Sequence, residues 1–181
     1  PEDWVRRHIH ICFDVCHYGV SFDKPSSCLQ ELAEKNISIG KIQISSALRV
    51  DLRKDASARI EALKQYEEPT YLHQVKALKK DGTFEQFKDL GEALAQYQDG
   101  VYDEWRVHFH VPLFLDSYGL LNSTQAEIAE TLAYHQQHHV TRMMEIETYT
   151  WGVLPSEYQE SIETSIAREV TYIQDLLCKK P

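Results

Sequence analysis

Several features that would assign the chain to a common class are missing. No apolar run approaches the roughly 18 residues of a membrane span, and no basic-then-apolar stretch resembles a signal peptide. The four cysteines, Cys12, Cys16, Cys28 and Cys178, form no CxxC pair, which predicts reduced, mostly core thiols in a cytoplasmic protein. Seven glycines without a GxGxxG motif count against a nucleotide-binding phosphate loop.

Positive charge is also scarce. Against 28 acidic residues there are 19 basic ones, for a net charge of −9, and the basic residues are scattered. A nucleic-acid-binding protein usually presents a basic patch, so we expect no nucleic-acid partner. The remaining composition, 181 residues with 43% hydrophobic content, suits one domain with a sizeable core. Because the chain begins with Pro1 and enters a strand within eight residues, we expect residues 1–181 to be the C-terminal part of a longer protein.

The opening stretch shows the clearest pattern. Polar and apolar residues alternate from His8 to Asp14, which predicts a strand, and the lack of Lys, Arg or Ser on the even face predicts that both faces are buried. His17 follows three residues after Asp14. A carboxylate and an imidazole at a strand end suit a divalent metal or acid/base chemistry. The alternative is a buried Asp14 that is satisfied by the neighbouring histidine.

Strand and helix patterns then alternate along the chain. Strands are expected at 8–14, 41–45, 105–112 and 140–149, with helices between them, and an Asp-Gly turn predicts an inserted β-hairpin at about 70–89. Such a series fits half of a (β/α)₈ barrel or half of a doubly wound sheet. We favour the barrel, an α/β fold, because the chain has no glycine-rich phosphate loop and each strand ends in polar residues.

Those strand ends predict the site, because the strand ends of a barrel meet at one rim. The residues are Asp14 and His17, Gln43 and Ser45, His108 and His110, and Glu145 and Glu147. Imidazoles and carboxylates without a thiolate set favour a borderline or hard divalent ion. Alternatively, the two strand histidines are hydrogen-bonded core residues, or Glu145 pairs with Arg106 or Arg142 and only Glu147 belongs to the site. The cluster His135, His138 and His139 is more typical of a helix terminus than of a metal site.

Several phrases of the sequence together resemble a known superfamily. The strand-end "FDVCH" and the later "IET" are similar to metal-binding motifs of the fifth and eighth strands of xylose isomerase-like TIM barrels. The phrases "HICFDVCH", "IGKIQISSALRV", "YLHQV", "WRVHFHVPLF", "EIETYTWGVLP" and "SIAREV", over nearly the whole chain, resemble the EboE family of metabolite-traffic proteins. This resemblance implies the C-terminal half of a barrel, about strands five to eight, with the N-terminal half missing.

The resemblance also implies site residues. Asp14, His17 and Glu147 fall on metal-ligand positions, and His108 or His110 falls near the histidine of the seventh strand. The ion is Zn²⁺, Mn²⁺ or Mg²⁺, which the sequence does not distinguish. The sixth strand departs from the pattern, because neutral Gln43 stands where a metal-binding His or Asp is usual, and this favours a single metal over a multinuclear centre.

For function, the resemblance implies handling of a small metabolite for export, together with other proteins of the same gene cluster. An enzyme of this superfamily would isomerise or epimerise a small polyhydroxy compound, with Glu147 or His110 moving the proton and Gln43 at the substrate. Arg49, just past the second strand, is a candidate to bind an anionic substrate group, and the alternative for it is ordinary loop packing. The first alternative is a non-catalytic carrier or scaffold that keeps the pocket for binding. The second is an endonuclease IV-like phosphodiesterase, which the acidic balance disfavours.

Overall fold

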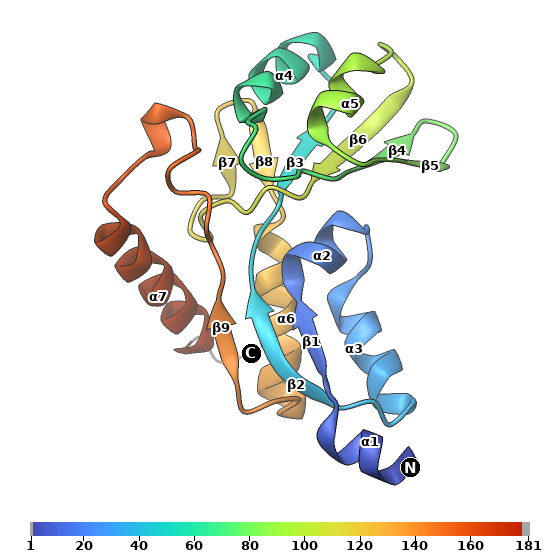
Figure 1. Cartoon of the computed structure of the whole chain (residues 1–181), viewed down its shortest axis with the longest axis vertical. Helices are drawn as coiled ribbons and strands as arrows, with labels where there is room; N and C mark the ends of the chain where they lie inside the picture. The colour runs from blue at the N-terminus through green and yellow to red at the C-terminus, as the bar shows by residue number, and fades with distance from the viewer. Residues whose placement is uncertain (1, 179–181) are drawn as a thin grey trace.

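The computed structural model describes residues 2–178, so Pro1 and residues 179–181 of the expected domain lie outside the described residues. The chain is mixed α/β, as expected, with two separate sheets (Figure 1). Within residues 2–178, no helix is both long and apolar enough to cross a membrane.

The first sheet is parallel and has three strands in the order β1-β2-β9. These are β1 (Ile11–Asp14), β2 (Ile39–Ile44) and β9 (Met144–Ile146). In Figure 1 all three arrows point toward the second sheet. Their carboxyl ends therefore face the junction between the two sheets.

Helices precede or follow the strands of the parallel sheet along the chain. They are α1 (Glu2–His8), α2 (Val15–Val20), α3 (Pro25–Glu34), α6 (Gln125–His138) and α7 (Ile162–Cys178). The apolar side chains of β1, β2, α3, α6 and α7 share one core, which includes Phe13, Ile42, Leu29, Ile128 and Ile173. Burial of this apolar face is what fixes the sheet on its helices.

The second sheet is antiparallel and has six strands in the order β5-β4-β6-β3-β8-β7. The strands are β3 (Leu48–Asp51), β4 (Val75–Lys79), β5 (Phe84–Phe87), β6 (Tyr102–Val107), β7 (Ser117–Tyr118) and β8 (Leu121–Ser123). It carries α4 (Ala56–Leu63), α5 (Leu90–Ala95) and two 3₁₀ turns, η1 (Lys64–Tyr66) and η2 (Ser156–Tyr158). A second and larger core, centred on fully buried Trp105, joins this sheet to α4 and α5.

The hairpin is confirmed, since β4 and β5 pair around the Asp81-Gly82 turn. Gly82 has a φ of 83°, a conformation that favours glycine. The hairpin is also more than an insertion, because β4 pairs with β6 and so belongs to the antiparallel sheet.

The prediction that residues 105–112 form a strand of the parallel sheet is wrong. The first half of this segment lies in β6, where Val107 is paired antiparallel with Leu48. Its second half continues as extended chain, and the Val111 amide donates to the Ser46 carbonyl. Alternation of apolar residues predicts a strand but not its partner, and here β9 pairs directly with β2. The described residues therefore form three parallel strands and no closed barrel.

The opening strand also differs from expectation. His8 ends α1, the strand begins at Ile11, and Cys12 on the even face is exposed. Lys41 and Glu145 form an ion pair on the neighbouring strands of the sheet. In the part of the chain that the structure describes, helices cover the apolar face alone, so the even face stays polar.

Candidate metal centre

The candidate centre lies where the parallel strands end, at the junction of the two sheets. Asp14 is the last residue of β1, Glu147 follows β9 directly, and His110 lies in the extended segment after β6. The Glu147 amide donates to the Ile44 carbonyl, which holds the end of β9 against β2. Three segments far apart in the sequence are thus brought to one place (Figure 1).

Asp14 is fixed by its neighbours before any ligand is considered. As the N-cap of α2, its Oδ1 accepts from the His17 amide at 3.3 Å. The same oxygen accepts from the Ser45 hydroxyl at 2.7 Å, and Ser45 Oγ in turn accepts from the Cys16 amide at 2.9 Å. Ser45 is completely buried, so this chain of hydrogen bonds orients the Asp14 carboxylate from the protein interior.

Glu147 approaches Asp14 closely. Burial raises the pKa of Glu147, and the charge of Asp14 and a hydrogen bond with its side chain raise it further, while a hydrogen bond from Gln43 lowers it. Two carboxyl groups this close repel unless a proton or a cation lies between them. The pair is therefore a place where positive charge is favoured.

His110 is almost fully buried, and its partners determine its tautomer. Nδ1 lies 3.1 Å from the Glu147 carbonyl oxygen, which can only accept, so Nδ1 carries the proton. Burial lowers the pKa of His110, which favours the neutral ring. Nε2 then holds a lone pair that faces His108 Nε2 at 3.0 Å. A backbone carbonyl on the other nitrogen is the usual way that a metal-binding histidine is oriented.

His108 and His17 complete the group of imidazoles. His108 Nε2 lies 3.0 Å from His110 Nε2, and burial together with the two neighbouring imidazoles lowers the pKa of His108 to about 4. His17 packs its ring against His108 at 4.3 Å between centroids, and its Nε2 lies 3.8 Å from Asp14 Oδ2. With its side chain 59% exposed, His17 lies at the rim rather than inside.

A second layer of side chains supports the histidines. The ring of Tyr149 packs on His110 at 4.6 Å. His73 is buried and contacts two neighbours. Its Nδ1 lies 3.1 Å from the His108 carbonyl oxygen, and its Nε2 lies 2.7 Å from Glu68 Oε1. Such outer contacts fix ligand orientation, and neither Glu68 nor His73 carried a signal in the sequence that marked it for this role.

Two sets of donor atoms are close enough to hold an ion, and His110 belongs to both. The donors of Asp14, His110 and Glu147 lie within 4.8 Å of one another, and so do those of Cys16, His108 and His110. Imidazole nitrogen with carboxylate oxygen suits a divalent ion, so the residues present fit the metal that the resemblance implies. A cleft of about 440 Å³ opens beside the centre, lined by Cys12, Asp14, His17, Tyr18, Ser21, Asp23 and Gln43.

The structure brings together most of the residues expected from the sequence. Asp14, His108, His110 and Glu147 meet at the centre, while His17 and Gln43 line the cleft. Arg49 is not brought there: it lies on β3, and its Nε donates to Glu104 Oε2 at 3.0 Å.

The structure decides some of the alternatives that the sequence leaves open for the glutamates and histidines. Glu145 pairs with Lys41, not with Arg106 or Arg142, so Glu147 alone belongs to the centre. The two strand histidines are hydrogen-bonded to each other and also lie within reach of metal-binding partners. His135, His138 and His139 lie at the end of α6, outside both donor sets. Cys16, which the sequence groups with the core thiols, is also part of a donor set, with His108 and His110.

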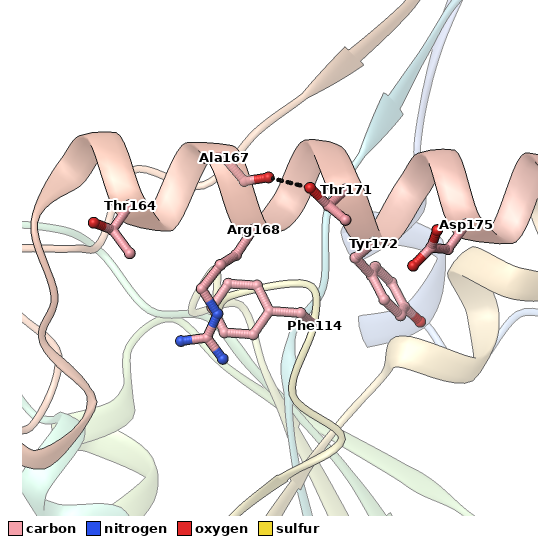
Figure 2. Close-up of a pocket in the computed structure, with 7 residues that line it drawn as sticks. All are labelled: Phe114, Thr164, Ala167, Arg168, Thr171, Tyr172 and Asp175. Carbon is pink, nitrogen blue, oxygen red and sulfur yellow. Dashed lines mark hydrogen bonds between the residues drawn. The ribbon is translucent and has the colours of Figure 1, made fainter.

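A larger hollow of about 520 Å³ lies elsewhere, between α7 and Phe114. Figure 2 shows Arg168 lying over the ring of Phe114, with Tyr172 and Asp175 further along the helix. The Arg168 guanidinium is paired with Glu160, and no ligand-type cluster is found there among the described residues. The larger hollow is therefore not the one that lies beside the candidate metal ligands.

Comparison of the chain with protein-family models, with curated proteins and with solved structures finds no match.

Proposed function

We propose that the chain binds one divalent metal ion through Asp14, His110 and Glu147 and uses it to handle a small polyhydroxy metabolite. The observation that carries this proposal is the meeting of two carboxyl groups with the buried His110 imidazole at the end of the parallel sheet. Like-charged carboxylates are brought together in a folded protein where a cation or a proton offsets their repulsion.

The roles of the chain's own residues follow from their contacts. Asp14 and Glu147 supply carboxylate oxygen ligands, and His110 supplies an imidazole nitrogen. Gln43, which lines the cleft and contacts Glu147, is placed to bind a substrate hydroxyl. A bound divalent ion would polarise a carbonyl or hydroxyl oxygen of the metabolite. A carboxylate or imidazole that the ion leaves free can then move a proton.

The resemblance of the sequence to the EboE family adds a more specific role to this proposal. It supports an EboE-type metabolite-traffic role and the C-terminal half of a xylose isomerase-like barrel, in a cytoplasmic protein that works with other proteins of its gene cluster. The shared direction of β1, β2 and β9 and their polar carboxyl ends agree with a barrel rim.

The first test is metal binding with a matched pair of variants on one strand end. Equilibrium dialysis against Zn²⁺, Mn²⁺ and Mg²⁺ should give about one ion per chain for the wild type. Glu147→Gln should lose this binding, whereas Glu145→Gln should retain it, because Glu145 is paired with Lys41 outside the centre. Equal binding by both variants, or none by the wild type, would refute the proposal.

A second candidate function is a non-catalytic carrier. The neutral amide of Gln43 supports it, since an amide binds a hydroxyl better than it binds a metal or moves a proton. A panel of aldoses, ketoses and polyols would be screened by thermal shift with metal present, and bound compounds followed by NMR. Binding without conversion would favour the carrier, and conversion that is lost in Glu147→Gln would favour the enzyme.

A further inference from the structure

Cys16 lies under the candidate centre rather than in an ordinary core. It is the second residue of α2, two residues after Asp14, and it is completely buried. Its amide donates to Ser45 Oγ, the hydroxyl that also holds Asp14. Its position is therefore fixed by the same hydrogen bonds that orient a proposed ligand.

The thiol is within reach of two imidazoles. The donor atoms of Cys16, His108 and His110 lie within 4.8 Å of one another. His108 Nε2 and His110 Nε2 are 3.0 Å apart, close to the separation of about 3.3 Å that two nitrogens have on a tetrahedral zinc ion with bonds near 2.0 Å.

The protons between these groups are ones that a metal can replace. Since His110 carries its proton on Nδ1, its bare Nε2 accepts from His108 Nε2 across the 3.0 Å contact. A cation in that position would be bound by both imidazoles after the His108 proton moves to its Nδ1. The thiol would release its proton to solvent on binding and form a thiolate–metal bond, so that these three residues release one proton in total.

We propose that Cys16 is a ligand of the ion bound at His110, and that the site therefore selects a thiophilic, borderline ion of the Zn²⁺ class over Mg²⁺ or Mn²⁺. This inference rests on the proposed function, because it needs an ion at His110. A thiolate is a soft ligand, and soft ligands favour zinc and its neighbours over the hard ions that prefer oxygen. The exposed thiol of Cys12 on β1 lies in neither donor set.

Cobalt substitution tests the ligand directly. Co²⁺ bound by a thiolate gives an intense charge-transfer absorption in the near ultraviolet, which nitrogen and oxygen ligands do not give. Wild type would be compared with Cys16→Ser, with Cys12→Ser as the matched control, and with a variant that keeps only Cys16 (Cys12→Ser, Cys28→Ser and Cys178→Ser together). Protons released per Zn²⁺ bound would be counted in weakly buffered solution.

The expected result is a charge-transfer band in the wild type, in Cys12→Ser and in the variant that keeps only Cys16. Cys16→Ser should lose the band, release one proton fewer per ion and bind Zn²⁺ more weakly by at least tenfold. If Cys16→Ser does not fold, the variant that keeps only Cys16 decides alone.

Other outcomes separate this inference from the proposed function. Cobalt that binds in a Glu147-dependent way without the band would overturn the role of Cys16 and leave the proposed function standing. A band that persists in Cys16→Ser would assign the thiolate to another cysteine and overturn the inference. No binding of either ion would overturn both.

Discussion

The two sheets of this molecule differ in what their side chains do. The antiparallel sheet buries the larger apolar core, with Trp105 packed against Phe87, Tyr97 and Tyr102. The parallel sheet has one apolar face on its helices and one polar face with exposed Cys12. Its strands β1 and β9 lead to Asp14 and Glu147, the two carboxyl groups of the candidate centre.

This difference indicates a division of labour. Acidic groups that approach each other cost stability, so they need a rigid support that is held together by other contacts. The antiparallel sheet provides it through the segment after β6, which carries His108 and His110 to the ends of β1 and β9. We expect changes in the antiparallel core to affect mainly folding, and changes at the parallel strand ends to affect mainly binding.

The largest expected effect is that of Trp105→Ala in the antiparallel core. Removing a fully buried indole should lower the free energy of unfolding by about 3–5 kcal/mol, measured by urea denaturation. Metal affinity per folded molecule should stay within a factor of about three, since each factor of ten corresponds to 1.4 kcal/mol. A loss of affinity in the folded fraction would show that the two sheets do not divide their roles.

A second prediction concerns pH and the buried His108. Its pKa in the folded state is about 4, below the ordinary value of 6.5, so between these values the unfolded chain takes up a proton that the folded chain does not. Stability should therefore fall as the pH drops from 6.5 toward 4, by up to about 3 kcal/mol from this group. Glu147, whose pKa is raised, acts with the opposite sign and loses stability as the pH rises through its folded pKa.

The contribution of His108 can be isolated by difference. Urea denaturation of wild type and His108→Gln at pH 6.5, 5.5 and 4.5 should show a steeper loss in the wild type. Parallel slopes for the two proteins would contradict the assignment.

The third prediction concerns buried Glu169 on α7, which joins the two regions. Its Oε1 accepts from the Leu113 amide at 3.1 Å and from the Thr148 hydroxyl at 2.6 Å. Glu169→Leu leaves the buried amide without this partner and should destabilise the fold by about 1–3 kcal/mol. Exposed Glu163→Leu on the same helix is the control and should change stability by less than about 0.5 kcal/mol. Equal thermal shifts for both variants would refute this role.

The smallest expected effect is at the hairpin turn. Gly82→Ala forces alanine to a φ of 83° with nothing within 4 Å of its Cβ, so the cost of about 1 kcal/mol is conformational. Gly152→Ala is matched, because its Cβ also meets nothing and its φ is ordinary. Denaturation midpoints should fall for Gly82→Ala and hardly move for Gly152→Ala, and the reverse order would contradict this account.

Part of the fold could be predicted because local patterns specify it. The strand–helix–strand unit from β1 to β2 and the β4–β5 hairpin follow from periodicity and turn chemistry. The placement of residues 105–112 could not be predicted, since alternating apolar residues suit either sheet and only tertiary packing selects β3 as the partner. The exposed polar face of β1 was missed for the same reason.

The candidate site shows the same limit. Asp14, His110 and Glu147 were expected because strand-end polar residues meet in parallel folds. The predicted place of Arg49 at the site was wrong, because no local pattern reveals that Glu104 on β6 forms an ion pair with it. The proximity of Cys16 to His108 and His110 could be recognised only from the three-dimensional structure, because the two imidazoles come from a segment far away in the sequence.

The central claim is that an ion binds where the parallel strands end, and anomalous diffraction from crystals of the chain soaked in Zn²⁺ tests it most directly. The account predicts a single strong anomalous peak about 2.0–2.2 Å from donor atoms of Asp14, His110 and Glu147. A peak found only at His135, His138 and His139 at the end of α6, or no peak at the junction of the two sheets, would contradict it.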